Sequence, residues 1–76
     1  MALAPLRERL KKVEAQLAKL QAEAATIDGA LNDPRLYAGN NGDLITRATA
    51  RRAAISKEVE ALETEWLELQ EKMEAA

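Results

Sequence analysis

Two stretches of the chain repeat apolar residues with an alternating spacing of three and four, and this pattern constrains the fold more than any other feature. Such a spacing places the apolar side chains on one stripe of an α-helix, at the a and d positions of a heptad. The sequence therefore predicts two long helices, each with one apolar seam. The first seam consists of Leu6, Leu10, Val13, Leu17, Leu20, Ala24, Ile27 and Leu31. The second consists of Ile45, Ala48, Arg52, Ile55, Val59, Leu62, Trp66, Leu69 and Met73.

Capping and breaking residues predict the ends of both helices. Pro5 suits the first position of a helix, where its missing N–H would have no intrahelical acceptor, and Pro34 disfavours helix in the residue before it. The first helix is therefore expected over about residues 5–31. Asp43 is a good N-cap, because its carboxylate can accept from the free N–H groups of a first turn. The second helix is expected over about residues 43–75.

The connection, residues 32–42, contains the signals of a short helical turn over residues 34–38. Asp33 is placed to cap the start of this turn and Gly39 to end it, while Pro34 fits the first helical position. Two side chains of the turn are expected to fold back and close the open end of the seam: Leu36 and Tyr37. The alternative for the tyrosine is a contact with a partner.

Because the connection is short, the two helices must run antiparallel. Facing residues then have numbers that sum to about 75 or 76, so Leu20 faces Ile55 and the small Ala24 faces the long Arg52. We interpret Arg52 as a structural residue whose stem lies over Ala24 while its guanidinium reaches water; display at the tip for a partner is compatible with this. Residues 1–76 are thus expected to form one domain, an all-α, antiparallel two-helix coiled-coil hairpin.

The charges near the two termini support the antiparallel arrangement. The start of the first helix is basic, with Arg7, Arg9, Lys11 and Lys12. The facing end of the second helix is acidic, with Glu60, Glu63, Glu65, Glu68, Glu71 and Glu74. Opposite charges face each other only if the helices are antiparallel. Exposed pairs of this kind set orientation and register more than they add stability.

Cations also gather at the other end of the hairpin, beside the connection. They are Arg35, Arg47, Arg51 and Arg52, with Lys57 and Lys19 further down. Arginines grouped at one end of a rod can neutralise phosphates, so the four arginines and Lys57 form a candidate nucleic-acid-binding site. The alternative is an ordinary solvated surface with pairing between the helices, such as Arg51 with Asp28 or Glu23.

Two residue types that are common in catalytic and metal sites are absent. The chain has no cysteine and no histidine, which removes thiolate ligands, the commonest metal-binding imidazole and the commonest general base. It has no glycine-rich phosphate-binding motif and no apolar run long enough to span a bilayer. We therefore expect no catalytic, cofactor or metal site, no membrane partner, and a cytoplasmic protein. Trp66 is expected to pack in the seam against Leu10, with a role as a partner-binding anchor as the alternative.

Two segments carry a resemblance to a known family. Residues 31–37 read LNDPRLY, and residues 65–69, near the end of the second helix, read EWLEL. Together they resemble the C-terminal coiled-coil domain of ABC-F ATPases, closest to the Uup-like branch, in which an L-x-D-P-x-x-Y-like turn joins two helices and a W-x-x-L segment closes the second. The resemblance implies a soluble parent protein with two ATP-binding cassettes. ATP and Mg²⁺ would bind to those cassettes and not to this chain. A tRNA-binding synthetase arm, such as the C-terminal hairpin of valyl-tRNA synthetase, is less similar because it lacks the D-P-x-x-Y turn.

In the Uup-like branch this domain is associated with DNA binding. The resemblance and the tip cations together predict a non-catalytic accessory domain that binds nucleic acid, either DNA or structured RNA, through its phosphates. One alternative is a structural rod that docks on its own ATPase domains or on the ribosome. Another is a weak homodimer in which two hairpins form a four-helix bundle.

Overall fold

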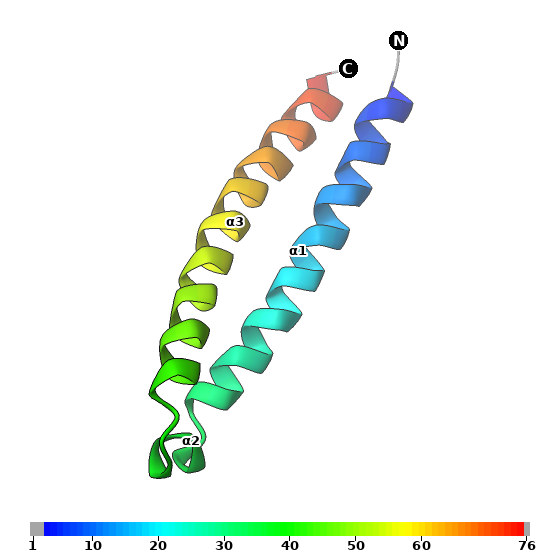
Figure 1. Cartoon of the computed structure of the whole chain (residues 1–76). Helices are drawn as coiled ribbons and strands as arrows, with labels where there is room; N and C mark the ends of the chain where they lie inside the picture. Colours follow the sequence, from blue (N-terminus) through cyan, green and yellow to red (C-terminus); the bar gives the residue numbers. More distant parts are fainter. Residues whose placement is uncertain (1–2, 76) are drawn as a thin grey trace.

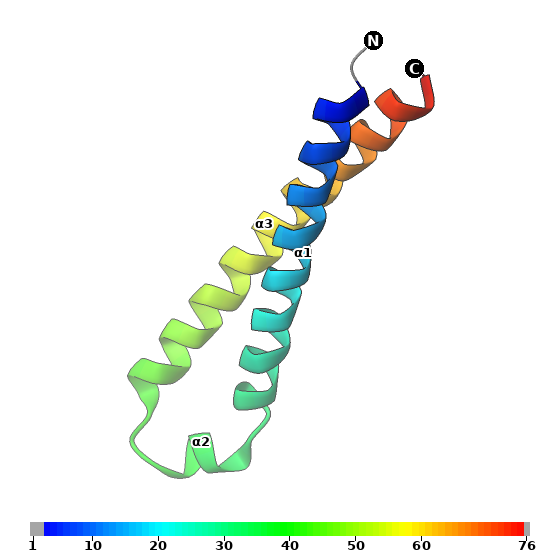
Figure 2. The same ribbon diagram turned by 90° about the vertical axis from the view of Figure 1, so that its right-hand side faces the viewer.

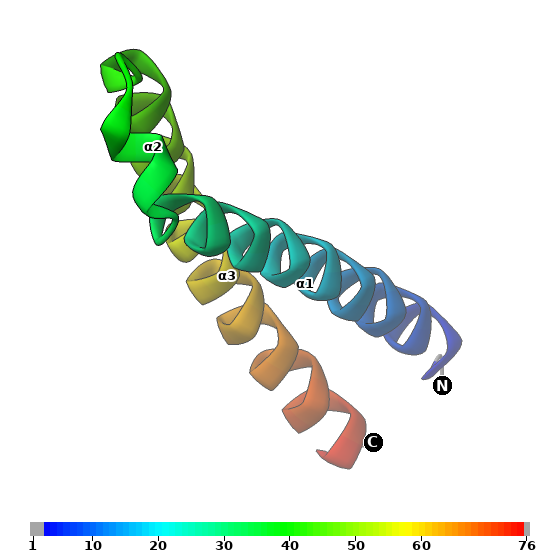
Figure 3. The same ribbon diagram turned by 90° about the horizontal axis from the view of Figure 1, so that it is seen from below.

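The computed structural model of the chain describes residues 3–75 and contains three helices in this range: α1 (Leu3–Leu31), α2 (Pro34–Ala38) and α3 (Gly42–Ala75). The long helices α1 and α3 lie side by side and antiparallel, so the start of α1 and the end of α3 lie at one end of the rod and α2 forms the opposite tip (Figure 1). Figures 2 and 3 show that the two helices cross at an angle. The result is a rod of 59 × 15 × 14 Å. The expected all-α helical hairpin is confirmed.

The two apolar seams form the contact between α1 and α3. Every residue of both predicted seams is buried or half-buried. Five side chains among residues 3–75 are buried, and all five come from the seams: Val13, Leu20, Ala24, Ile55 and Leu69. Ile55 is 0% exposed and forms the centre of the core with Leu20 and Ala24. Periodic apolar residues bury one stripe of each helix and leave the rest in water, which explains why a rod this thin has a core at all.

Both long helices begin earlier than the sequence indicates. α1 begins at Leu3, so Pro5 is its third residue, still within the first turn where backbone N–H groups have no intrahelical acceptor. α3 begins at Gly42, because the N–H of Ile45 donates to the carbonyl of Asn41 at 3.0 Å. The prediction that Asp43 caps α3 is therefore wrong. Asp43 lies inside the first turn, where its negative charge still complements the helix dipole.

The tip turn α2 is capped by the residues that the sequence indicates. Asp33 precedes it and accepts from the backbone N–H of Arg35 at 3.0 Å, Pro34 occupies its start, and Gly39 ends it. Leu36 is half-buried, but the ring of Tyr37 is 56% exposed, so the prediction that Tyr37 closes the seam is wrong.

Helical phase explains the outward position of the tyrosine. Consecutive side chains on a helix point about 100° apart, and the turn that directs Leu36 inward therefore directs Tyr37 outward. The Tyr37 hydroxyl donates to the carbonyl of Leu31 at 2.6 Å. This bond satisfies one of the carbonyls that the C-terminal end of α1 leaves without an intrahelical donor.

Candidate nucleic-acid interface

Arg35 lies at the tip and pairs with its own cap residue. Its guanidinium donates to the carboxylate of Asp33 at 2.8 Å while its side chain remains 90% exposed. The hydrogen bonds from the Arg35 side chain, and then from its backbone N–H, hold the pKa of Asp33 below its usual value. This arginine therefore stabilises the turn that it belongs to, and most of its surface stays in solvent.

Arg51 crosses from α3 to α1. Its Nε and Nη2 atoms donate to the two carboxylate oxygens of Glu23 at 2.6 and 2.9 Å, and Glu58 lies 3.7 Å from Nη1. The hydrogen bonds from Arg51 hold the pKa of Glu23 below its usual value. This is the helix-to-helix pairing that the sequence offered as the alternative to a free phosphate-binding arginine.

Arg52 occupies its seam position as a structural residue. Its Nε donates to Asp28 on α1 at 2.9 Å and its Nη1 to Ser56 at 2.8 Å, while Ala24 across the seam is buried. The stem thus fills the space that the small alanine leaves, and the charged group reaches the surface. Arg52 is half-buried, whereas the other four predicted phosphate-binding residues are exposed.

Arg47 and Lys57 are exposed and form no ion pair within 4.0 Å among residues 3–75. Three small exposed side chains lie between them on α3: Ala50, Ala53 and Ala54. Over residues 44–57 the helix carries three arginines and one lysine and no carboxylate. This part of α3 is therefore a cationic surface without obstruction by long side chains.

The basic start of α1 pairs with the acidic end of α3 at one point only among the described residues. Arg9 donates to Glu65 through Nε at 2.5 Å and Nη2 at 2.8 Å. These bonds are the main reason that the pKa of Glu65 lies below its usual value and that of Arg9 above it. The other charges that we expected to pair here remain in solvent, as flexible exposed side chains commonly do.

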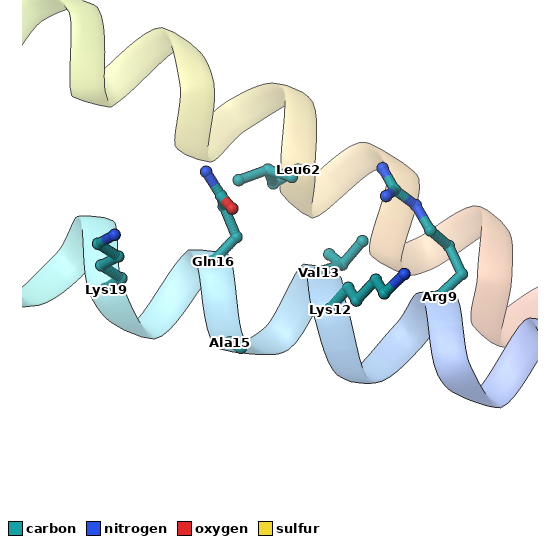
Figure 4. A pocket seen from close by; sticks show the side chains of 7 residues that line it. All are labelled: Arg9, Lys12, Val13, Ala15, Gln16, Lys19 and Leu62. Carbon is teal, nitrogen blue, oxygen red and sulfur yellow. The ribbon is translucent and has the colours of Figure 1, made fainter.

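A groove between the helices gathers cations that sequence reasoning did not place together. It is lined by Arg9, Lys12, Val13, Ala15, Gln16, Lys19 and Leu62 (Figure 4). Lys12 and Lys19 form no ion pair within 4.0 Å in the part of the chain that the structure describes. The sequence signal that could have placed these two lysines together is their spacing of seven residues. A spacing of one heptad puts two side chains on the same face of a helix.

The opposite side of the seam has a different chemistry. The indole N–H of Trp66 donates to Glu14 at 3.3 Å, and the ring is half-buried beside Leu17 and Leu67. Leu67 is 56% exposed. Carboxylates border this apolar surface: Glu63, Glu71 and Glu74. Trp66 thus occupies the seam as expected, but one face of it reaches the surface.

Within residues 3–75 the acidic side chains form no group that could hold a metal ion. No helix in this range combines the length and the apolar character that crossing a bilayer requires.

Fold and surface together define a class of domain: a rod-shaped helical hairpin with cations along one side and a carboxylate-bordered apolar surface on the other. The chain belongs to the ABC transporter C-terminal domain family, whose sequence model matches residues 5–71. Comparison with curated proteins and with solved structures gave no match. The family confirms the resemblance that the tip turn and the Trp66 segment carry, at the level of a C-terminal domain of ABC proteins.

Proposed function

We propose that this chain is a non-catalytic accessory domain that binds nucleic acid, DNA or structured RNA, through its phosphates. The parent protein would be a cytoplasmic ABC-F ATPase of the Uup-like branch, whose cassettes bind ATP and Mg²⁺. The observation that carries the proposal is the cationic surface of α3 over residues 44–57, where Arg47 and Lys57 are exposed and outside any ion pair among the described residues. Lysine and arginine that neutralise phosphates release condensed counterions, which drives binding without base recognition.

The paired arginines also support the proposal, because their partners hold them weakly. The side chains of Arg51 and Arg35 are 43% and 90% exposed while bonded to Glu23 and Asp33. An exposed ion pair contributes little net stability, so a phosphate can replace the carboxylate at small cost. Arg52 is the exception, since its stem is part of the seam.

The distribution of charge along α3 also indicates which half of the rod attracts a polyanion. Residues 58–74 of α3 carry seven glutamates and one lysine, in contrast to residues 44–57. Phosphates are repelled by the first segment and attracted by the second. The tip half and not the terminal half of α3 is therefore the expected contact region.

Binding of labelled duplex DNA, single-stranded DNA and structured RNA by fluorescence anisotropy at two salt concentrations tests the proposal. Three phosphate contacts predict non-specific dissociation constants of about 10⁻⁴–10⁻⁶ M and a log–log salt slope of roughly −3. The informative variant is Arg47→Gln/Lys57→Gln, which removes two cations without breaking an ion pair. Its matched control is Arg7→Gln/Lys11→Gln, which removes the same charge at the other end. Equal affinities for these two variants, or no binding by the wild-type chain at low salt, would refute the proposal.

A second candidate function is docking on another protein surface, such as the ATPase domains of the parent or the ribosome. The observation that favours it is the exposed Leu67 beside half-buried Trp66, bordered by Glu63, Glu71 and Glu74. An apolar centre within a charged border is a common form of docking surface. Titration of the purified cassettes, followed by the fluorescence of the single tryptophan, measures this directly. Leu67→Ala should weaken binding, whereas Leu44→Ala, at a residue 53% exposed near the tip, should not.

A further inference from the structure

We propose that bound nucleic acid lies along one side of the rod, over a row of cations that continues from the tip into the groove between the helices. We call the four contact residues the basic row: Lys12, Lys19, Arg51 and Arg47. The inference rests on the proposed function and adds to it the binding face and two residues, Lys12 and Lys19, that the tip site does not include.

The first two members of the row share the groove. Lys12 and Lys19 both line it, with Gln16 between them reaching toward α3 (Figure 4). They lie two helical turns apart on the same face of α1, so their ammonium groups can contact one extended backbone.

The contacts of Arg51 place the other two members on the same side. Arg51 bonds to Glu23, which is one turn beyond Lys19 on α1. Lys19 and Glu23 are four residues apart and therefore share a face of α1, and the charge of Lys19 also contributes to the low pKa of Glu23. Arg47 precedes Arg51 by four residues and therefore shares its face of α3.

The spacing of the row suits an extended polyanion. Lys19 follows Lys12 by seven positions on α1. Glu23, which bonds to Arg51, follows Lys19 by four positions, and Arg47 lies four positions from Arg51 on α3. At about 1.5 Å per residue the row is roughly 22 Å long. A duplex of that length has about six phosphates on each strand, at 3.4 Å of axis each. Over that length, about two thirds of a turn of roughly 34 Å, each strand winds partly away from a straight row, so we expect only three or four of these phosphates to face it.

Carboxylates on the row side reduce its charge but do not cancel it. Three form ion pairs there: Glu23 and Glu58 with Arg51, which belongs to the row, and Glu65 with Arg9. The four cations of the row and Arg9 outnumber these three carboxylates. The lysines of the groove have no such partner among residues 3–75. A phosphate backbone on this side therefore meets excess positive charge.

The other side of the seam repels the same ligand. Glu14 and Glu63 lie there with Trp66 between them, and Glu71 and Glu74 continue the acidic surface toward the terminus. None of these four carboxylates has an ion pair within 4.0 Å in the described part of the chain. The contrast between the two sides selects the groove side as the binding face.

The test uses three variants, each lacking two positive charges, with a labelled 20-base-pair duplex as the probe. Lys12→Gln/Lys19→Gln removes the groove end of the row, Arg47→Gln/Lys57→Gln removes tip cations, and Arg7→Gln/Lys11→Gln removes cations of α1 that do not line the groove. Circular dichroism verifies that each variant keeps the helical content of the wild type.

We expect the groove variant to bind about tenfold more weakly at 50 mM salt. Its log–log salt slope should be shallower by about 1.8, at roughly 0.9 per lost phosphate contact. The control Arg7→Gln/Lys11→Gln should stay within about twofold of the wild type. If the groove variant binds like the control while the tip variant is impaired, the extended binding face is wrong and the nucleic-acid function stands. If the wild type does not bind at all, both are wrong.

Discussion

Arg51 on α3 and Glu23 on α1 form a two-bond ion pair across the outside of the seam, with donor–acceptor distances of 2.6 and 2.9 Å. The pair lies on the groove side of the rod, at the point where the basic row passes from α1 to α3. It connects the two helices in the folded chain, and in the proposed complex Arg51 would exchange this carboxylate for a phosphate. The same arginine can therefore contribute to the register of the hairpin, when it binds the carboxylate of Glu23, and to the proposed nucleic-acid binding, when it binds a phosphate.

The Arg51–Glu23 pair predicts a pH-dependent contribution to stability. The bonds to Arg51 hold the pKa of Glu23 below its usual value, so the unfolded chain binds a proton to this carboxylate more readily than the folded chain. Stability from the pair is therefore fully present above the ordinary glutamate pKa of about 4.3 and is lost as the pH falls through the lower folded value.

The measurement compares the thermal unfolding midpoints of the wild type and Glu23→Gln from pH 7 to pH 2.5. We expect the variant to be less stable at pH 7 and equal to the wild type at pH 2.5. Working with this difference removes the effects of pH that the two proteins share. A difference that does not change with pH would show that the pair contributes nothing in solution.

Ile55 should be the residue at which truncation costs most. It is 0% exposed and lies between Leu20 and Ala24, so Ile55→Ala removes buried methyl groups and leaves a cavity, at a cost of about 2–5 kcal/mol. That is comparable with the roughly 3–5 kcal/mol that a core this small supplies. We therefore expect this variant to be largely unfolded at 25 °C.

Ile55→Val provides a graded version of the same experiment in urea-induced unfolding. It should fold and lose about 0.5–1.5 kcal/mol. Leu44→Ala, at a residue 53% exposed, should change stability by less than about 0.5 kcal/mol. A larger effect at Leu44 than at Ile55 would place the core elsewhere.

Gly29 should be a site where substitution stabilises the protein. It lies inside α1, and a Cβ atom there would meet nothing within 4 Å, so close approach of the tip loop is not the reason for this glycine. Gly29→Ala should raise the free energy of unfolding by about 1 kcal/mol through helix propensity, or the unfolding midpoint by roughly 4–8 °C.

Gly39→Ala is the matched comparison, because it places the same methyl group in a crowded position. There a Cβ atom would lie 3.2 Å from Nδ2 of Asn41, the atom that donates to the carbonyl of Leu36. We expect no gain or a small loss at Gly39. Similar gains at both glycines would indicate that the tip turn tolerates displacement of the Asn41 side chain.

Self-association through a second apolar stripe should be weak. The large apolar side chains that are exposed among residues 3–75 are Tyr37, Leu44 and Leu67, and they occur singly, two near the tip and one near the termini. Both seams are already used inside the hairpin, which leaves no continuous stripe for a four-helix bundle. Sedimentation equilibrium at tens of micromolar should give the mass of one chain; a stable dimer at that concentration would contradict this prediction.

Much of the fold followed from the sequence because the determining interactions are periodic and local. The spacing of three and four places every seam residue on the face that becomes buried, from Leu6 to Met73. The cap at Asp33 and the stop at Gly39 depend on neighbours two to six residues away, so the tip turn could also be predicted. The same local segment, with the Trp66 region, carried the resemblance that the family match confirms.

The tertiary structure decided which charges meet. Helical periodicity states which residues share a face, but not whether a long side chain reaches a partner on the other helix, which depends on how the two helices rotate and cross. For this reason three features emerge only from the packed hairpin: the choice of Glu23 over Asp28 as the partner of Arg51, the outward position of Tyr37, and the grouping of Lys12 with Lys19 in one groove. The sequence determined that two helices fold together along apolar seams, and their packing determined which cations remain available for a partner.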